Sequence, residues 1–170
     1  MKSKLISILL ILNLIVTGSL LCSYTFGRKE EAVVGRVTGI GGVFFKAKDP
    51  KAANKWYQDN LGLAASDYGS MFEWRESDSK NIAYTQWSLF SAKTKYFMPS
   101  KKDFMINYRV DNMDMLLKKL KANNVIICDT VQSDGFGKFL HILDCDSNKV
   151  ELWQPVPVTT ENMFKGKTTK

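Results

Sequence analysis

Two stretches of this chain decide its fold: Gly42–Leu63, which reads GVFFKAKDPKAANKWYQDNLGL, and Met105–Val125, which reads MINYRVDNMDMLLKKLKANNV. Each begins with alternating apolar and polar residues, reaches an aspartate (Asp49 or Asp111), and continues with apolar residues at helical spacing. Internal repetition indicates repeated structural units. Because two copies are too few for a solenoid, we interpret them as the two halves of one sheet-and-helix domain.

The repeat also predicts where two helices begin and end. Asp49 suits the N-cap of the first helix, Pro50 its first position, and Gly62 its end. The spacing of apolar residues predicts that one face of this helix is buried, composed of Ala53, Trp56, Tyr57 and Leu61. The second helix is expected over Asn112–Asn123, and its apolar positions are Met113, Leu116, Leu117 and Leu120.

Period-two alternation and turn residues predict eight strands around these helices. They are Gly39–Lys48, Ala65–Tyr68, Ser70–Trp74, Ala83–Leu89, Asp103–Val110, Val125–Gln132, Lys138–Leu143 and Lys149–Gln154. The predicted fold class is α+β, with paired βαβββ modules forming a curled eight-stranded mixed sheet. Helices would cover one face of the sheet, and the other face would form a concave pocket.

The length and composition of the chain indicate its domain organisation. The chain has 170 residues, of which 45% are hydrophobic, so one packed domain is expected. The net charge of +7 comes from scattered lysines and not from a dense arginine-rich stripe, which argues against nucleic-acid binding. We predict a linker over 24–38, the domain over 39–155, and a flexible tail over 156–170.

Residues 1–23 have the order of a signal peptide or an N-terminal anchor. The positive residues Lys2 and Lys4 precede the apolar run Leu5–Val16, and small residues follow at 17–19. The apolar stretch extends to Cys22 and approaches the lower limit for a spanning helix, so an uncleaved anchor is the alternative. Leu21 before Cys22 argues against lipidation. Either way, the domain is expected to be exported and extracytoplasmic, secreted or attached to the membrane by its N-terminus.

Cys128 and Cys145 form the only other cysteine pair. An exported protein could join them. They lie, however, on the two arms of a predicted hairpin with its turn near Asp134–Gly137. In its register Cys128 does not stand opposite Cys145, so the two Cα atoms would be too far apart for a disulfide. We therefore expect two free, half-buried thiols.

Three segments in order resemble the vicinal oxygen chelate superfamily, the group of glyoxalase I, fosfomycin and bleomycin resistance proteins and extradiol dioxygenases. They are DPKAANKWYQDNLGL (49–63), RVDNMDMLLKKL (109–120) and DCDSNKVELWQP (144–155). The resemblance covers Gly39–Gln154 and implies the same curled sheet. It also implies pairing into homodimers and a metal site made by four inward-facing strand positions.

Those four positions, carried over from the resemblance, are Gly42, Trp87 with Gln86 beside it, Met105, and Glu151. Only Glu151 keeps the family's ligand type. A divalent metal needs about three or more nitrogen, oxygen or sulfur donors. No metal cofactor is therefore expected.

The leading functional hypothesis is a metal-free exported domain that binds a small organic molecule in the concave pocket. The expected lining is Phe44, Trp87, Met105, Asn107, Arg109, Glu151 and Trp153. The alternative is an enzyme of the superfamily, a lyase, isomerase or dioxygenase, with an atypical metal site or with Glu151 as acid and base. A purely structural surface protein is the third hypothesis.

Two residues have competing interpretations. Glu151 faces the pocket if Val150 and Leu152 face the helices. It is then either a polar anchor or base, or a structural carboxylate paired with Arg109 or Asn107. His141 is expected to be hydrogen-bonded and partly buried on a core face with Phe139 and Leu143, and not to act as ligand or base.

Overall fold

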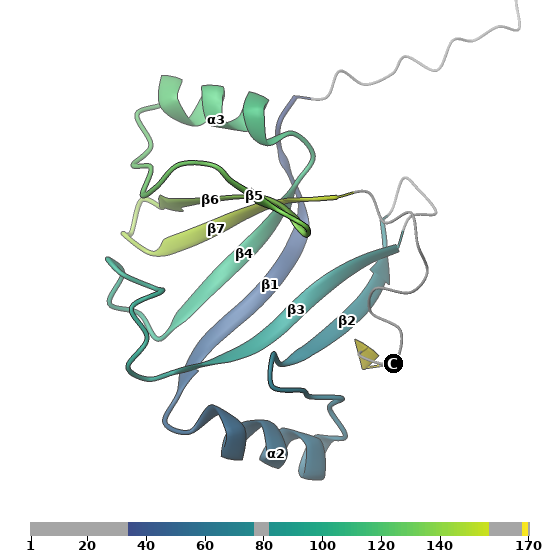
Figure 1. Ribbon diagram of the computed structural model, residues 1–170. Helices are drawn as coiled ribbons and strands as arrows, with labels where there is room; N and C mark the ends of the chain where they lie inside the picture. Colours follow the sequence, from purple (N-terminus) through teal and green to yellow (C-terminus); the bar gives the residue numbers. More distant parts are fainter. Residues whose placement is uncertain (1–33, 77–81, 157–167, 170) are drawn as a thin grey trace, which may run out of the picture. The chain divides into compact units, whose positions relative to one another are not determined.

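The structure, a computed structural model, describes residues 34–76, 82–156 and 168–169 (Figure 1). Its elements in chain order are β1 (Val37–Ala47), α2 (Pro50–Leu61), β2 (Ser70–Arg75), β3 (Ile82–Ser91), β4 (Phe104–Val110), α3 (Met113–Ala122), β5 (Gln132–Asp134), β6 (Gly137–Leu143), β7 (Lys149–Pro155) and β8 (Thr168–Thr169). This composition of elements confirms the α+β class.

Strands β1 to β7 form one open mixed sheet in the order β5-β6-β7-β4-β1-β3-β2, and the two-residue β8 lies beside β2. The strands that begin the two sequence repeats, β1 and β4, are antiparallel neighbours at the centre. Each has a parallel partner on its other side, β3 for β1 and β7 for β4. The repeat therefore corresponds to two related halves that meet along β1 and β4.

The predicted βαβββ module is complete in the second half only; the first half is βαββ. The expected strand Ala65–Tyr68 is a turn closed by a bridge between Ser66 and Gly69. The Ser66 hydroxyl donates to the Gly69 carbonyl and accepts the Tyr68 N–H, and Gly69 has a φ of +93°. Such local side-chain bonds compete with a strand ladder, so this segment does not extend the sheet.

The expected strand Val125–Gln132 is also shorter than predicted. Only Gln132–Asp134 pairs with β6, together with an isolated bridge between Ile127 and Ile142. Between them, the Asp129 carboxylate accepts the backbone N–H of His141 at 2.9 Å. A side chain thus takes a β6 donor that a neighbouring strand would otherwise use.

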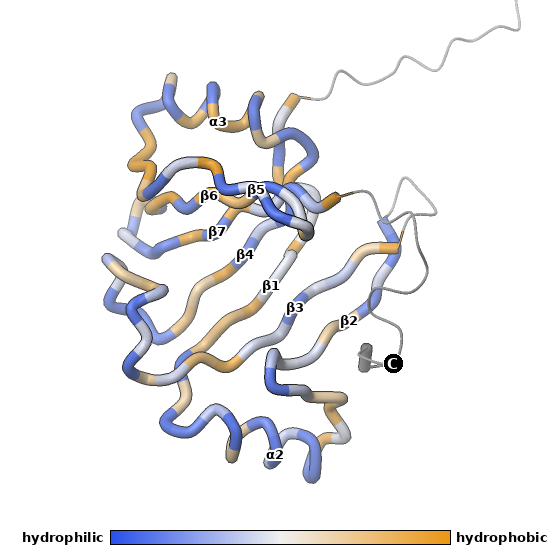
Figure 2. Tube along the Cα trace, viewed as in Figure 1, coloured by the Kyte–Doolittle hydropathy of each residue, from blue (hydrophilic) through white to orange (hydrophobic). Residues whose placement is uncertain are grey.

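Helix α2 begins and ends as predicted, but the prediction of its buried face was wrong. Asp49 caps its start and Gly62, with a φ of +68°, ends it. Trp56 is 54% exposed, and Leu61 is exposed as well. The helix meets the sheet through Tyr57, whose ring lies 4.8 Å from that of Trp87 on β3. One narrow stripe of side chains is enough for this contact, and α2 is largely hydrophilic along its length (Figure 2).

Helix α3 follows the prediction closely. Asn112 caps it, and Met113 and Leu116 are buried. They form the main core with Val110, Leu140 and Leu152, and Leu117 and Leu120 pack against its edge. Both helices contact the same face of the sheet. The strand register places Trp87, which contacts α2, on the same face as Val43 and Ile106. Ile106 shares this face with Val150 and Leu152, which pack under α3.

Several expectations concern residues beyond these ranges. The predicted targeting segment, 1–23, and most of the linker lie outside the described residues. Within the described part of the chain, neither helix is long and apolar enough to cross a membrane.

Cys128 and Cys145 are both free, as predicted. Cys145 is exposed and not half-buried, because it lies in the turn between β6 and β7.

Candidate functional site

The face of the sheet opposite the helices, here called the open face, carries the candidate site. Alternation places Leu152 of β7 in the α3 core and therefore turns Glu151 to the open face. Asn107 of β4 pairs in register with Glu151 on one side and with Gly42 of β1 on the other. Two positions along the same strands, Arg109 pairs with Trp153.

Glu151 is the centre of a buried polar network. Its side chain is 5% exposed and accepts three hydrogen bonds. The Asn107 amide donates to Oε1 at 3.0 Å, and the Tyr96 hydroxyl donates to Oε2 at 2.6 Å. The third partner of the carboxylate is Nε2 of His141, at 3.3 Å from Oε2. The carboxylate is therefore held in one orientation from three sides.

His141 lies directly across from Glu151 in the β6–β7 register. Its second ring nitrogen, Nδ1, is 2.5 Å from Oδ2 of Asp129. Each ring nitrogen thus faces a carboxylate oxygen. A neutral imidazole has one nitrogen lone pair and would direct it at one of those anions, whereas the imidazolium donates to both. The geometry therefore favours the protonated ring.

The pKa values agree with this assignment. Burial acts to lower the pKa of His141, but hydrogen bonds to Glu151 and Asp129 outweigh it and raise the pKa above the usual value of 6.5. Burial acts to raise the pKa of Glu151, but hydrogen bonds from His141, Tyr96 and Asn107 hold it below 4.5. Between about pH 4.5 and pH 6.5, these two shifts make Glu151 and His141 a buried ion pair.

Tyr96 reaches the site from the loop between β3 and β4. Its ring stacks on Phe90 at 5.4 Å and meets the His141 ring edge-on at 5.3 Å. Burial and the charge of Glu151 raise the pKa of Tyr96 well above its usual range, so the hydroxyl stays a donor. Nearby, the buried rings of Phe44 and Phe97 pack with Met105. Aromatic side chains therefore border the network on this side.

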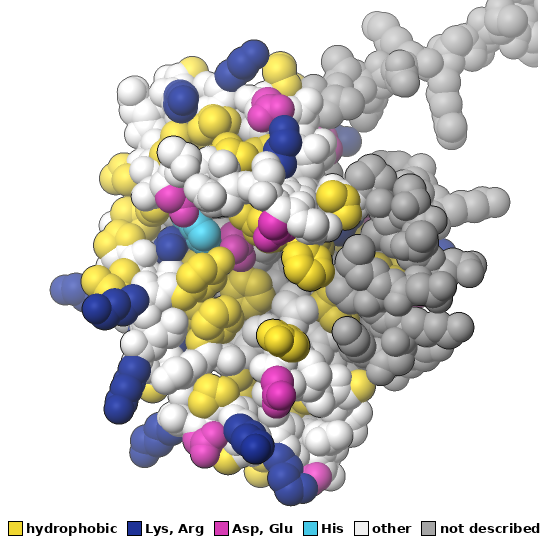
Figure 3. Space-filling model, viewed as in Figure 1, with side chains coloured by type: hydrophobic (Ala, Val, Ile, Leu, Met, Phe, Trp, Pro, Cys, Tyr) yellow, Lys and Arg dark blue, Asp and Glu magenta, His cyan; other side chains and the backbone are white. Residues whose placement is uncertain are grey.

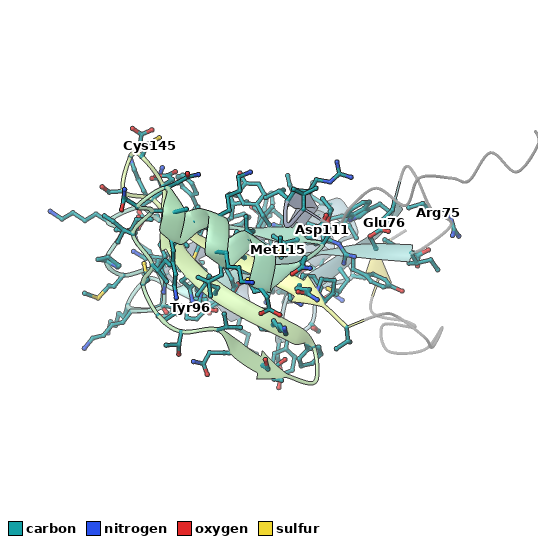
Figure 4. All side chains as sticks on the ribbon, turned by 90° about the horizontal axis from the view of Figure 1, so that it is seen from above. Arg75, Glu76, Tyr96, Asp111, Met115 and Cys145 are labelled. Carbon is teal, nitrogen blue, oxygen red and sulfur yellow. The ribbon has the colours of Figure 1, made fainter. Side chains whose placement is uncertain are left out.

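Arg109 lies at the other end of the network. Its Nη2 donates to Glu76 at 3.1 Å, and its guanidinium lies 5.4 Å from the Trp153 ring and 5.7 Å from the Trp74 ring. Figure 4 shows Tyr96 and Glu76 on opposite sides of the domain. Figure 3 shows the single histidine side chain, in cyan, beside acidic and hydrophobic side chains on this face. Polar side chains thus extend across the open face from Glu151 to Arg109, with aromatic side chains at both ends.

Six of the seven expected lining residues lie on the open face: Phe44, Met105, Asn107, Arg109, Glu151 and Trp153. Trp87 is the exception, and its placement was wrong. It shares a face with Val43 and Phe45 and packs under α2. Its neighbour Gln86 is the residue of β3 that stands in register with Gly42.

Of the two pairing partners expected for Glu151, the structure confirms one. Glu151 pairs with Asn107, as one interpretation predicted, whereas Arg109 pairs with Glu76. The expected hydrogen bonding of His141 is confirmed, but its surroundings differ from those expected. Leu140 enters the core, so His141 lies on the open face with Glu151 and not on a core face.

Sequence reasoning missed three residues of the network: Tyr96, Asp129 and His141 as a site member. Tyr96 and Asp129 lie in irregular segments, where periodicity carries no signal. His141 could have been found, because β6 alternates, and an apolar Leu140 facing the helices turns His141 toward Glu151.

The residues present do not fit a divalent metal. The sheet register places Gly42, Gln86, Asn107 and Glu151 in one row, with Asn107 in the place that the resemblance gave to Met105. Only Glu151 is anionic, and its charge is already paired with His141. Among the residues described, no group of three or more His, Cys, Asp or Glu side chains could hold a metal ion. Such an ion normally takes about three or more protein donors.

Comparisons with known proteins identify the fold and leave the activity open. No family model and no curated protein sequence matches the chain. Methylmalonyl-CoA epimerase from Streptomyces coelicolor, in complex with 2-nitronate-propionyl-CoA, matches with a TM-score of 0.53 at 13% identity over 71% of this chain and 99% of that one. A methylmalonyl-CoA epimerase in complex with methylmalonyl-CoA and NH4+ matches with 0.53 at 15% identity, over 72% and 98%.

A glyoxalase/bleomycin resistance protein/dioxygenase superfamily member from Vibrio splendidus 12B01 also matches, with a TM-score of 0.42 at 11% identity over 71% of this chain and 98% of that one. At such identities, a structural match describes the path of the backbone and not the chemistry of the site.

Proposed function

Because the chain has the fold of the vicinal oxygen chelate superfamily, as its sequence resemblance implies, we propose that it binds a small organic molecule on the open face without a divalent metal. The observation that carries this proposal is the buried network of Glu151, His141, Asn107 and Tyr96. A few oriented polar groups among aromatic side chains are the usual lining of a small-molecule site. Buried ionisable groups with shifted pKa values also concentrate at functional sites.

The solved structures with this fold give further support for a small-molecule ligand, because two of them hold acyl-CoA compounds. The order of residues 1–23 supports a place of action outside the cytoplasmic membrane, with the N-terminal segment as signal peptide or anchor. The ligand would then be one that is met in the extracytoplasmic space.

A thermal-shift screen of small organic molecules on the full-length chain tests the proposal. Each compound that stabilises the protein is then titrated against two matched carboxylate-to-amide variants. Glu151→Gln alters the network, whereas Asp59→Asn alters an exposed residue of α2 that pairs with Lys55 and lies outside the network. We expect about tenfold weaker binding to Glu151→Gln and no change for Asp59→Asn. Equal binding to both variants, or no binding compound at all, would refute the proposal.

One observation favours a second candidate, a metal-free acid–base enzyme of the superfamily's lyase or isomerase kind. Glu151, His141 and the Tyr96 hydroxyl lie within 3.3 Å of one another, so a proton can move among them. A compound from the screen, incubated with the protein in D2O, distinguishes the two candidates. An enzyme of this kind would exchange a carbon-bound hydrogen of the compound, whereas a binding protein would leave its NMR spectrum unchanged.

A further inference from the structure

Helix α3 concentrates positive charge on the side that faces away from the sheet. Met113 and Leu116 mark its buried side. Helical geometry places five exposed residues on the opposite side, here called the α3 outer face: Met115, Lys118, Lys119, Lys121 and Ala122. Basic side chains gather over this helix at the top of Figure 3.

The three lysines of the α3 outer face have no ion-pair partner among the described residues. Asp114, the acidic residue of this helix, is paired with Lys138 of β6 at 2.8 Å. Helix α2 differs, because its Lys55 is balanced by Asp59 one turn later. The α3 outer face is therefore the more basic of the two helix surfaces, and it suits an anionic partner.

Apolar side chains are exposed beside these lysines. Met115 is 42% exposed, and its position on the helix lies between those of Lys118 and Lys119. Val34, just before β1, is 60% exposed. Lysines attract anionic lipid headgroups, and apolar side chains can enter the boundary between headgroups and acyl chains. The combination fits a phospholipid surface.

The N-terminal part of the chain joins the domain beside this helix. A Cβ at Gly35 would collide with the backbone of Leu116, so the two lie in close contact. The N–H of Arg36 donates to the Asp111 carboxylate at 2.8 Å, and the Arg36 carbonyl accepts the Asp111 N–H at 3.2 Å. Helices α3 and α2 lie at opposite ends of the domain (Figure 1). An N-terminal anchor would therefore pull on the α3 end.

The chain before this point is short. Residues 23–33 separate Cys22, the end of the apolar stretch, from Val34. Even fully extended, this segment reaches no further than about 40 Å. A tether of this kind raises the effective concentration of the anchoring surface to the millimolar range. Each lysine near an anionic surface strengthens binding roughly fivefold, so three lysines add about a hundredfold, enough for a tethered domain.

We propose that the α3 outer face rests on an anionic phospholipid surface in which the N-terminal segment anchors the chain. The three lysines meet the phosphate groups, and Met115 enters among the headgroups. Because α3 packs on the side of the sheet opposite the open face, this contact leaves the open face free for its ligand. The inference takes from the proposed function the anchor form of residues 1–23, and it is independent of any ligand.

Hydroxyl-radical footprinting of the full-length chain in vesicles tests the contact. Mass spectrometry compares the oxidation of Met115 with that of Trp56, which is 54% exposed on α2 and is the internal control. Phosphatidylcholine vesicles take up the anchor alone, whereas added phosphatidylglycerol supplies negative charge. We expect phosphatidylglycerol to slow Met115 oxidation roughly tenfold and to leave Trp56 oxidation unchanged. Salt at about 1 M should remove most of this protection.

Two matched triple variants locate the effect. The first combines Lys118→Gln, Lys119→Gln and Lys121→Gln. The second removes the same charge from exposed positions at the α2 end through Lys48→Gln, Lys51→Gln and Lys55→Gln. Glutamine has nearly the helix propensity of lysine, so both variants should fold, as circular dichroism would verify. Protection of Met115 by phosphatidylglycerol should be lost in the first variant and kept in the second.

Four results would overturn the proposal. They are equal Met115 oxidation in the two kinds of vesicle, protection of Trp56 in place of Met115, protection that persists in the first triple variant, and protection in phosphatidylcholine that grows with the number of chains per vesicle. The last result would place a second copy of the chain on this face. Flotation with phosphatidylcholine vesicles tests the anchor separately, and a chain that does not float would refute both the anchor and the contact. Ligand binding on the open face stands or falls by the thermal-shift screen alone.

Discussion

Tyr96 donates its hydroxyl to Oε2 of Glu151 at 2.6 Å, although the two residues are 55 positions apart in the chain. This contact joins the loop between β3 and β4 to the middle of β7. Lys149, also on β7, adds a second link by donating to the Tyr96 carbonyl at 2.7 Å. A loop residue thereby takes a fixed place over the open face.

Removal of the Tyr96 hydroxyl should weaken this link without changing the fold. Tyr96→Phe is expected to lower the free energy of unfolding by about 1.5–3 kcal/mol, the usual size of one hydrogen bond to a charged group. Urea unfolding followed by circular dichroism measures the change. Tyr68→Phe is the control, because Tyr68 is 86% exposed and the same substitution there should have no effect. A loss as large in the control would show that the Glu151 contact is not the cause.

The Glu151–His141 pair should make stability depend on pH in two directions. The pKa of His141 is raised above 6.5 in the folded state. Its contribution is therefore complete below the unfolded value and is lost as the pH rises through the folded one. The pKa of Glu151 is lowered below 4.5, so its contribution is complete above 4.5 and is lost as the pH falls through the folded value. Stability from this pair should be greatest between about pH 4.5 and pH 6.5.

Urea unfolding at a series of pH values checks this profile, and NMR titration of the His141 ring gives its pKa directly. His141→Gln should remove the decline on the alkaline side, since an amide does not titrate in this range. A His141 pKa at or below 6.5 would contradict the ion pair that the geometry indicates.

The sequence predicts the fold well where a local pattern decides the structure. The N-cap residues Asp49 and Asn112 and the αL residue Gly62 mark helix ends through bonds made within a few residues. The prediction fails where tertiary contacts choose between local alternatives. Trp56 fits the helical spacing of a buried face, but the position of α2 over Trp87 turns Tyr57 inward and leaves Trp56 exposed.

The site is predicted in part for a similar reason. Alternation in β4 and β7 correctly turns Asn107, Arg109 and Glu151 to one face, because a strand has a period of two residues. The same rule cannot place Tyr96 or Asp129, whose side chains reach Glu151 and His141 from irregular segments. Trp87 was misassigned by a single residue, and a shift of one position in a strand moves a side chain to the opposite face.

The exposure of Trp56 gives a prediction about stability. Trp56→Ala should change the free energy of unfolding by less than about 1 kcal/mol, the range of surface substitutions. Leu116→Ala, in the buried core under α3, should instead cost about 2–5 kcal/mol. Urea unfolding of the two variants under one condition makes the comparison. A large loss for Trp56→Ala would mean that another surface covers this residue in solution.

The targeting prediction concerns the first 23 residues, which lie outside the described part of the chain. A reporter fused after Gln154 of the full-length chain should be active only in the extracytoplasmic compartment. Replacing Lys2 and Lys4 with glutamate should weaken this orientation, because positive residues before an apolar segment favour the cytoplasmic side. A reporter that is active in the cytoplasm would contradict export.

The donor chemistry of the open face predicts the response to metals. Gly42 offers no side-chain donor, and Asn107 turns its amide nitrogen, not its metal-ligating oxygen, toward Glu151. The amide nitrogen of Gln86 is bonded to Tyr68 and Ser88, and Glu151 is paired with His141. An ion at Glu151 would have to displace the imidazolium and would still lack about two further ligands. The purified full-length chain should therefore hold far less than one zinc, iron, manganese or nickel ion per molecule, and a chelator should leave its unfolding temperature unchanged. About one ion per chain by elemental analysis, lost in Glu151→Gln but kept in Asp59→Asn, would contradict this prediction and favour a metal-dependent enzyme.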